Sequence, residues 1–375
     1  MDPDSKWQSL KKRYIGLDIF RLMAVAAILM LHTVNHLNAD YGPLQYFARM
    51  GAVFMTAFFM ISGFSLFINN ASQNIIKLPE LKNFFRKRII GIVPMYYVTY
   101  ILFVLFYFCA SRIFDTLNYS LGDELSLAPV ELLGIQSNFY SLGEYSHNGM
   151  TWFISCLLMC YLVYPLMQEV AKQISSKAKI IIIVLLAGIL LYSPMIQVIY
   201  NTATNYANPF FRILEFFIGV LLASMKPQYD EKPFVKKYIC NWVTVIIADI
   251  LMVAGISAAV RMDISVRNYM LYSAFCLPFF IVMLIGFSGV SSNVLSKSKV
   301  IRYCCDISYV FFLSQLFSET VCNILIVRFN IRNNLIVILL GWAVCAAVAV
   351  LMHEVFEKPL KKAINKLMTK GNSKK

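Results

Sequence analysis

Charged residues are scarce in this sequence of 375 residues. Asp, Glu, Lys and Arg together make up 14 %, whereas hydrophobic residues make up 59 %. Because a soluble globular domain carries about 25 % charged residues, this composition excludes an ordinary soluble protein. The nine cysteines show no CxxC pair or other metal-ligand spacing, and the sequence lacks a glycine-rich phosphate loop, a coiled-coil heptad run and a low-complexity linker. We therefore expect one membrane domain without a metal cofactor.

Long hydrophobic stretches are the main feature that the sequence does contain. Ten of them are long enough to cross a bilayer as helices. They cover residues 15–37, 50–68, 89–110, 151–168, 179–196, 209–225, 241–260, 269–289, 303–325 and 333–356. The first stretch is too long and too polar for a removable signal peptide, so we expect it to be retained. The predicted fold class is an all-α integral membrane protein with about ten transmembrane helices.

Lys and Arg are unevenly distributed between these stretches. If the N-terminus is cytoplasmic, the inner segments hold 26 of the 34 basic residues, the outer loops hold six, and two lie inside spans. Basic residues accumulate on the cytoplasmic side of membrane proteins, so both termini are predicted to be cytoplasmic. The net charge of +14 is explained by this asymmetry and by contact with anionic membrane lipids, without a nucleic-acid partner.

The predicted topology divides the chain into three parts. Residues 1–14 form a cytoplasmic amphipathic lead-in, and residues 15–357 form the membrane domain, in which residues 111–150 are the longest outer loop. Residues 358–375 form a basic cytoplasmic tail. The sequence does not indicate an oligomeric state.

The first hydrophobic stretch carries four polar side chains that a membrane helix should avoid: Asp18, Arg21, His32 and His36. At about 100° of rotation per residue they fall on one side of the helix. Charges in hydrocarbon cost several kcal/mol, so this side should face the interior of a helix bundle. Arg21 and His32 are separated by about 16 Å along the axis, and we expect Asp18 to pair with Arg21 one turn away.

A basic cluster precedes the third stretch, and it has two interpretations. Arg86, Lys87 and Arg88 either anchor the helix in lipid headgroups or bind the phosphates of a cofactor that arrives from the cytoplasm. Arg212 and Glu215, one turn apart in the sixth stretch, are predicted to form a local pair that either neutralises charge or orients His32.

Further polar residues lie at the end of the long outer loop and in a late span. His147, Asn148 and Trp152 are residue types that bind sugars through hydrogen bonds and ring stacking, although loops often carry such residues. Glu319 lies in the ninth stretch, on a different predicted helix from the histidines. Ionisable groups on several helices indicate a shared polar cavity, which either a carrier or a membrane transferase would use.

The residues 14–33, YIGLDIFRLMAVAAILMLHT, resemble the first span of acyltransferase family 3, whose signature is Arg or Lys, ten residues, then His. Arg21 and His32 meet this spacing. Other segments that are similar to the family follow in its order: FFMISGF, KRIIGIVPMYY, TWFISCLLMCYLVYPL, DISYVFFLSQ and a closing EKP. The chain departs from the family pattern at Gly91, where a second basic residue is typical, and at Gln315, where His is frequent.

The resemblance implies a membrane O-acyltransferase that moves an acyl group, usually acetyl, from cytoplasmic acyl-coenzyme A to a hydroxyl of an extracytoplasmic carbohydrate or lipid-linked glycan. It implies polysaccharide O-acetylation in the cell envelope, at a bacterial cytoplasmic membrane. His32 takes the catalytic position and Arg21 that of the motif cation. The donor is expected at Arg86, Lys87, Arg88 and Arg21, with Glu215 or Glu319 orienting His32. The acceptor is expected at His36, His147, Asn148, Trp152 and Arg212.

Two alternatives to the enzyme remain at this point. The same cavity suits a carrier of an envelope-glycan precursor or small amphiphile that performs no chemistry. The departures at Gly91 and Gln315 also fit a family member that acts as a sensor or scaffold. His36, one turn beyond His32, is a second candidate for the base.

Overall fold

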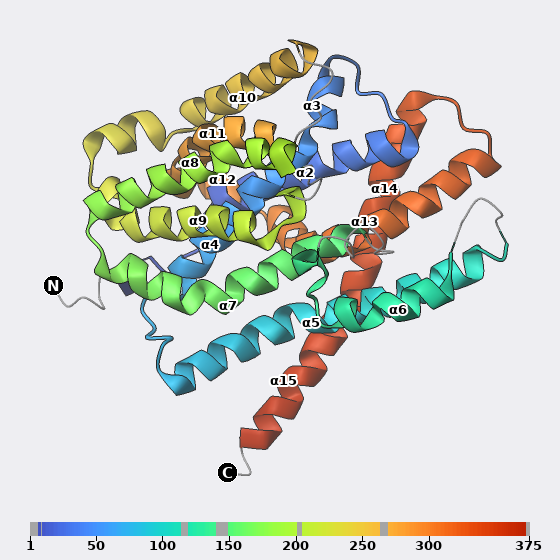
Figure 1. Cartoon of the computed structure of the whole chain (residues 1–375), viewed down its shortest axis with the longest axis horizontal. Coiled ribbons are helices and arrows are strands. Elements are labelled where there is room, and N and C mark those ends of the chain that lie inside the picture. Colours follow the sequence, from blue (N-terminus) through green and yellow to red (C-terminus); the bar gives the residue numbers. More distant parts are fainter. Residues whose placement is uncertain are drawn as a thin grey trace.

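The computed structural model describes residues 7–8, 10–113, 119–139, 149–200, 205–262 and 269–372. Within these ranges the secondary structure is helical and includes no strand, which confirms the predicted all-α class. Figure 1 shows the helices packed side by side, with α2 and α4 inside the bundle. The longer helices are α2 (Ile15–Leu37), α4 (Phe54–Asn70), α5 (Leu78–Ala110), α7 (Trp152–Gln173), α8 (Ser176–Tyr200), α9 (Pro209–Asp230), α10 (Trp242–Met262), α11 (Tyr269–Gly289), α13 (Lys299–Arg328), α14 (Asn334–Met352) and α15 (Lys358–Asn372).

Short helical elements connect the long ones. They are η1 (Gly42–Leu44), α3 (Gln45–Arg49), η2 (Gly51–Val53), α6 (Leu121–Leu132), η3 (Gln136–Asn138), η5 (Gly149–Thr151), η6 (Asn205–Ala207), η7 (Val235–Ile239), α12 (Asn293–Ser296) and η8 (His353–Glu357).

Seven helical segments among the described residues are long and apolar enough to cross a membrane. They are Ile15–Leu37, Gly51–Asn70, Leu78–Ala110, Gly149–Gln173, Ser176–Ile196, Lys299–Arg328 and Asn334–Lys366. The other three predicted stretches also form helices. The described apolar parts of α10 and α11 are shorter, at Trp242–Ala258 and Phe275–Gly289, and α9 carries four charged residues. The structure therefore supports a multi-helix membrane protein, while the count of ten spans and the direction of insertion stay predictions.

The helix boundaries follow local sequence signals. α9 begins at Pro209, directly after Asn208, whose side chain accepts a hydrogen bond from the Phe210 backbone N–H. Ser298 and Asn333 cap α13 and α14 in the same way. Such caps satisfy backbone N–H groups that have no partner within the helix. α2 ends where Asn38 adopts a left-handed conformation with φ 56°, and its N–H bonds to the Thr33 carbonyl.

The central packing depends on close approach between α4 and α9. A Cβ atom added at Gly63 would lie 2.0 Å from the carbonyl oxygen of Phe216, and one added at Gly219 would lie 2.0 Å from that of Met60. Only glycine permits the two backbones to approach this closely. α2 packs against α4, α11 and α13, so its polar side faces other helices rather than lipid alone.

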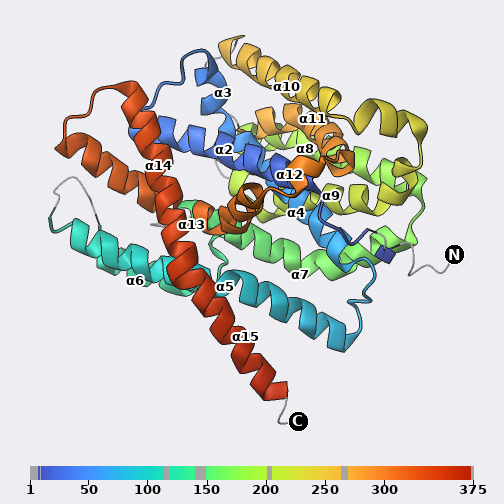
Figure 2. The same ribbon diagram turned by 180° about the vertical axis from the view of Figure 1, so that it is seen from behind.

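Two predicted segments contain more structure than expected. The outer loop predicted at residues 111–150 contains helix α6, whose Leu132 carbonyl accepts a hydrogen bond from the Tyr97 hydroxyl of α5 at 2.8 Å. The predicted tail at 358–375 contains α15, which continues α14 through the π-helical turn η8. α15 leaves the bundle toward the C-terminus in both views (Figures 1 and 2).

Candidate active site

Two histidines and a glutamate meet beside a pocket of about 270 Å³. His32 and His36 lie one turn apart on α2, with their ring centroids 5.7 Å apart, and Glu319 faces them from α13. One ligand atom from each of the three residues lies within 4.8 Å of the other two. The Glu319 side chain has no exposed surface, and neither of its oxygens has a hydrogen-bond partner among the described residues. We call this cavity the histidine pocket.

An aromatic wall, formed by Trp152 and Tyr206, also lines the histidine pocket. Trp152 at the start of α7 and Tyr206 in η6 both line the cavity, and their ring centroids lie 4.9 Å apart. Aromatic faces of this kind can stack on apolar faces of a ligand while polar groups bind its hydroxyls. The Nδ1 atom of His32 is buried and has no hydrogen-bond partner among the described residues, so no other protein group engages this ring nitrogen.

A second cavity, of about 360 Å³, lies around the other end of the polar side of α2. Its basic residues are Arg21, Lys87, Arg88 and Lys361, and its acidic residues are Asp306 and Glu357. Glu357 accepts a hydrogen bond from Lys361 at 2.6 Å. The excess of basic groups makes this cavity, the basic pocket, suitable for an anion such as a phosphate. Its lining also includes Gly91, so the position of the missing family cation faces the cavity.

A further basic cavity of about 370 Å³ adjoins the basic pocket at Arg21. Lys11, Lys12 and Arg13 line it together with Asp18, so it adds an excess of basic groups near the Arg21 end of α2. Tyr14 also lines this cavity, and burial, reinforced by Asp230, raises the pKa of its phenol to about 12.

Phe312 of α13 lines both the histidine pocket and the basic pocket. Its ring centroid lies 4.9 Å from that of Phe153 on α7 and 6.5 Å from that of Phe58 on α4. Phe58 and Phe153 line only the basic pocket. Together these three rings, which we call the aromatic partition, separate the two cavities.

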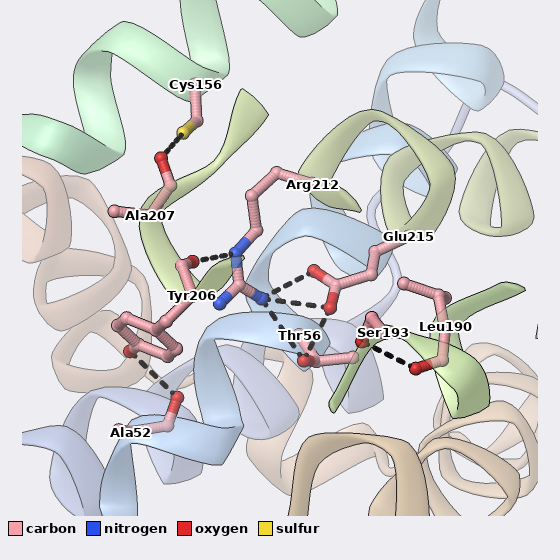
Figure 3. A network of polar contacts seen from close by, with 9 residues as sticks. All are labelled: Ala52, Thr56, Cys156, Leu190, Ser193, Tyr206, Ala207, Arg212 and Glu215. Atoms are coloured by element: carbon pink, nitrogen blue, oxygen red, sulfur yellow. Dashed lines mark hydrogen bonds and ion pairs between the residues drawn. The ribbon is translucent and has the colours of Figure 1, made fainter. Parts of the chain in front are cut away.

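A buried polar network supports the aromatic wall from behind (Figure 3). The Arg212 guanidinium donates to both carboxylate oxygens of Glu215 at 2.8 and 2.9 Å, and to the Tyr206 carbonyl at 2.8 Å. Thr56 of α4 donates to Glu215 at 2.8 Å. The guanidinium carbon also lies 4.6 Å from the ring centroid of Tyr206 and 5.4 Å from that of Trp152. The network thus fixes two residues of the histidine pocket without contacting the imidazoles.

The structure brings together part of the predicted site. His32, His36 and Glu319 form one cluster, and Trp152 lies across the same cavity. The predicted Arg212–Glu215 pair is present, but Glu215 bonds Arg212 and Thr56 rather than a histidine. His147 and Asn148 lie outside the described residues.

Only some of the residues predicted to bind the acyl donor line the basic pocket. Arg21, Lys87 and Arg88 line the basic pocket, whereas the exposed Arg86 turns away and donates to Asn83 at 2.9 Å. The expected pairing of Asp18 with Arg21 is wrong. Asp18 instead pairs with Arg13, which precedes the helix and reaches back to its first turn. Arg21 is thereby left facing the two basic cavities.

Sequence reasoning missed several residues of both cavities. Four residues of the cavities were not predicted as site residues: Tyr206, Phe312, Phe58 and Lys361. Aromatic residues make up 14 % of the chain, so their type alone does not mark a site, and Lys361 lay in the predicted tail. Only the packing of α4 and α13 against α2, with α7 and η6 held beside them by α9, brings the aromatic residues to the cavities.

The fold and the two cavities define a polytopic membrane protein with a histidine site adjacent to a basic cavity. The family model described as an acyltransferase domain matches residues 14–353, which is nearly the whole chain. The chain therefore belongs to the acyltransferase-3 family, and the family identifies it as a membrane acyltransferase. The comparisons with curated proteins and with solved structures gave no match.

Proposed function

We propose that the protein transfers an acyl group, typically acetyl, from cytoplasmic acyl-coenzyme A to a hydroxyl of an extracytoplasmic envelope glycan. The observation that carries the proposal is the arrangement of α2, which presents Arg21 to the basic pocket and His32 to the histidine pocket. One helix thereby carries a cation in the basic pocket and a potential base about 16 Å further along its axis. The unequal distribution of basic residues supports a cytoplasmic location for the Arg21 end.

The donor would bind at the basic end of α2. Its phosphates would contact Arg21, Lys87 and Arg88 in the basic pocket, and Lys11 to Arg13 in the adjoining cavity. Charge-assisted hydrogen bonds from guanidinium and ammonium groups are the usual means of binding phosphates. The long flexible arm of coenzyme A would then carry the thioester along α2 toward Phe312.

The acceptor would enter the histidine pocket from the opposite side of the membrane. A sugar ring would stack on Trp152 or Tyr206 and direct one hydroxyl toward His32. His32 would accept the hydroxyl proton as the oxygen forms a bond to the thioester carbonyl carbon. Collapse of the tetrahedral intermediate breaks the carbon–sulfur bond, and the imidazolium returns the proton to the leaving thiolate. Glu319, directed at the imidazoles from α13, would stabilise the imidazolium.

The aromatic partition must move during this reaction. Phe312 lies between the two cavities, so the thioester reaches His32 only after the ring changes rotamer. A partition that opens with both substrates bound would exclude water from the thioester before the acceptor arrives.

The test is a direct acyl-transfer assay on purified protein with radiolabelled acetyl-coenzyme A and glycan extracted from the envelope. A positioned general base contributes roughly 10² to 10⁴ in rate, so His32→Ala should lower turnover by about that factor. His36→Ala is the matched variant one turn away, and its turnover should fall less. Full activity of His32→Ala in a folded sample would remove His32 from the mechanism.

One observation also suits the carrier, because a closed partition between two cavities is what alternating access requires. Release of free thiol separates the two functions. The enzyme releases coenzyme A thiol in proportion to acylated glycan, whereas a carrier moves its substrate without consuming the thioester.

A further inference from the structure

His32 and His36 of the histidine pocket, together with Glu319 beside them, have a feature that general-base catalysis does not require. His32 and His36 are four residues apart on α2, the spacing at which two imidazoles on one helix face can bind the same metal ion. Glu319 adds a carboxylate from α13, at 3.9 Å between its Oε2 atom and His36 Nε2. Two imidazoles and one carboxylate, with a fourth position open, are a donor set of catalytic zinc sites.

The burial of Glu319 supports a cation at this point. Its side chain has no exposed surface, neither oxygen makes a hydrogen bond of normal geometry among the described residues, and its polar neighbours are the Gln315 amide on the same helix and His36 Nε2 at 3.9 Å. A buried carboxylate without hydrogen bonds is unfavourable unless it is protonated or paired with a cation. The Nδ1 atom of His32 is also buried and without a partner. The residues that carry these unpartnered atoms, Glu319 and His32, belong to the same cluster.

The distances require only a small adjustment. Ligand atoms around a tetrahedral zinc ion lie roughly 3.4 Å apart, given bonds of about 2.0 to 2.2 Å. The three atoms here lie within 4.8 Å of one another. The His36 side chain is 42 % exposed and can therefore rotate toward the other two. The pocket of about 270 Å³ provides both an entry route and room for a water molecule at the fourth position.

We propose that His32, His36 and Glu319 form a site for zinc, and that zinc bound there inhibits acyl transfer. Imidazole ligands favour zinc over magnesium or calcium, which prefer oxygen ligands alone. A zinc ion occupies the lone pair of His32 that would accept the hydroxyl proton, so the base is blocked while the metal is bound. The inhibition rests on the proposed function, whereas the binding does not.

Zinc binding is measured on the purified full chain in detergent, after chelator treatment, by titration with zinc sulfate against a zinc-sensitive dye. The wild type should bind one equivalent at this site. Glu319→Gln, which keeps the size of the side chain, and His36→Ala, at a partly exposed position, should each weaken binding by at least about tenfold. His353→Ala is the histidine control, since its imidazole contacts Glu357 outside the histidine pocket.

The outcomes separate this inference from the proposed function. Equal zinc affinity in the wild type, Glu319→Gln and His36→Ala would overturn the site, as would a loss of affinity in His353→Ala of the same size. Zinc that binds at this site and leaves acyl transfer unchanged or faster would overturn the inhibition. If His32→Ala keeps its acyl transfer but loses zinc, the zinc site stands and the general-base role fails.

Discussion

Breaking the buried Arg212–Glu215 pair should destabilise the protein far more than removing both charges together. The Arg212 and Glu215 side chains are 0 % and 1 % exposed, so neither charge can be solvated by water once its partner is lost. Arg212→Met would leave the Glu215 carboxylate with Thr56 as its remaining donor. Removing one member of a buried ion pair typically costs about 3 to 5 kcal/mol. Glu215→Gln should cost less than Arg212→Met, because the amide still accepts a hydrogen bond.

The double variant Arg212→Met/Glu215→Gln tests the coupling between the two charges. Because it leaves no buried unpaired charge, its loss of unfolding free energy should be smaller than the sum of the single losses by about 2 kcal/mol or more. Unfolding of the purified protein in mixed micelles, titrated with a denaturing detergent, gives the four values of the cycle. Additivity within about 0.5 kcal/mol would refute the reasoning.

A matched pair on the surface provides the control. Glu354 and Lys358 form an ion pair with side chains 43 % and 52 % exposed. Replacing either residue should leave unfolding unchanged, because solvent screens the pair. The cycle also decides between the two roles that the sequence left open for Glu215. If the pair is structural, the variants that remain folded should retain the pH dependence of acyl transfer.

Two further predictions concern the route of the donor. Phe312→Ala should join the two cavities and raise thiol release in the absence of acceptor. Phe312→Trp should lower acyl transfer. Unchanged thiol release from a folded Phe312→Ala protein would contradict the role of the aromatic partition. Lys87→Ala and Arg88→Ala should each raise KM for acetyl-coenzyme A by roughly tenfold, the equivalent of one charge-assisted hydrogen bond. Arg86→Ala should leave KM for acetyl-coenzyme A unchanged, because the Arg86 side chain lies outside the basic pocket. An equal rise of KM in all three variants would instead indicate a general effect of surface charge.

Much of the fold could be predicted because its signals are local. Apolar stretches of membrane length, the cap at Ser298 and the proline at Pro209 determine where helices begin, and they can be read within a few residues. The helical period also placed Arg21 and His32 on the polar side of α2. Helix α6 was missed because its 12 residues are too short for a span and the segment around it is polar.

By itself the sequence determined an all-helical membrane protein whose first span carries a cation at one end and imidazoles at the other. Only the tertiary structure decided which groups meet them. Glu319 reaches the histidines from a helix almost 300 residues away, Asp18 pairs with Arg13 instead of Arg21, and Phe312 divides the cavity. Periodicity fixes the face of a helix on which a side chain lies, but the partner of that face depends on how the helices pack, which no local pattern encodes.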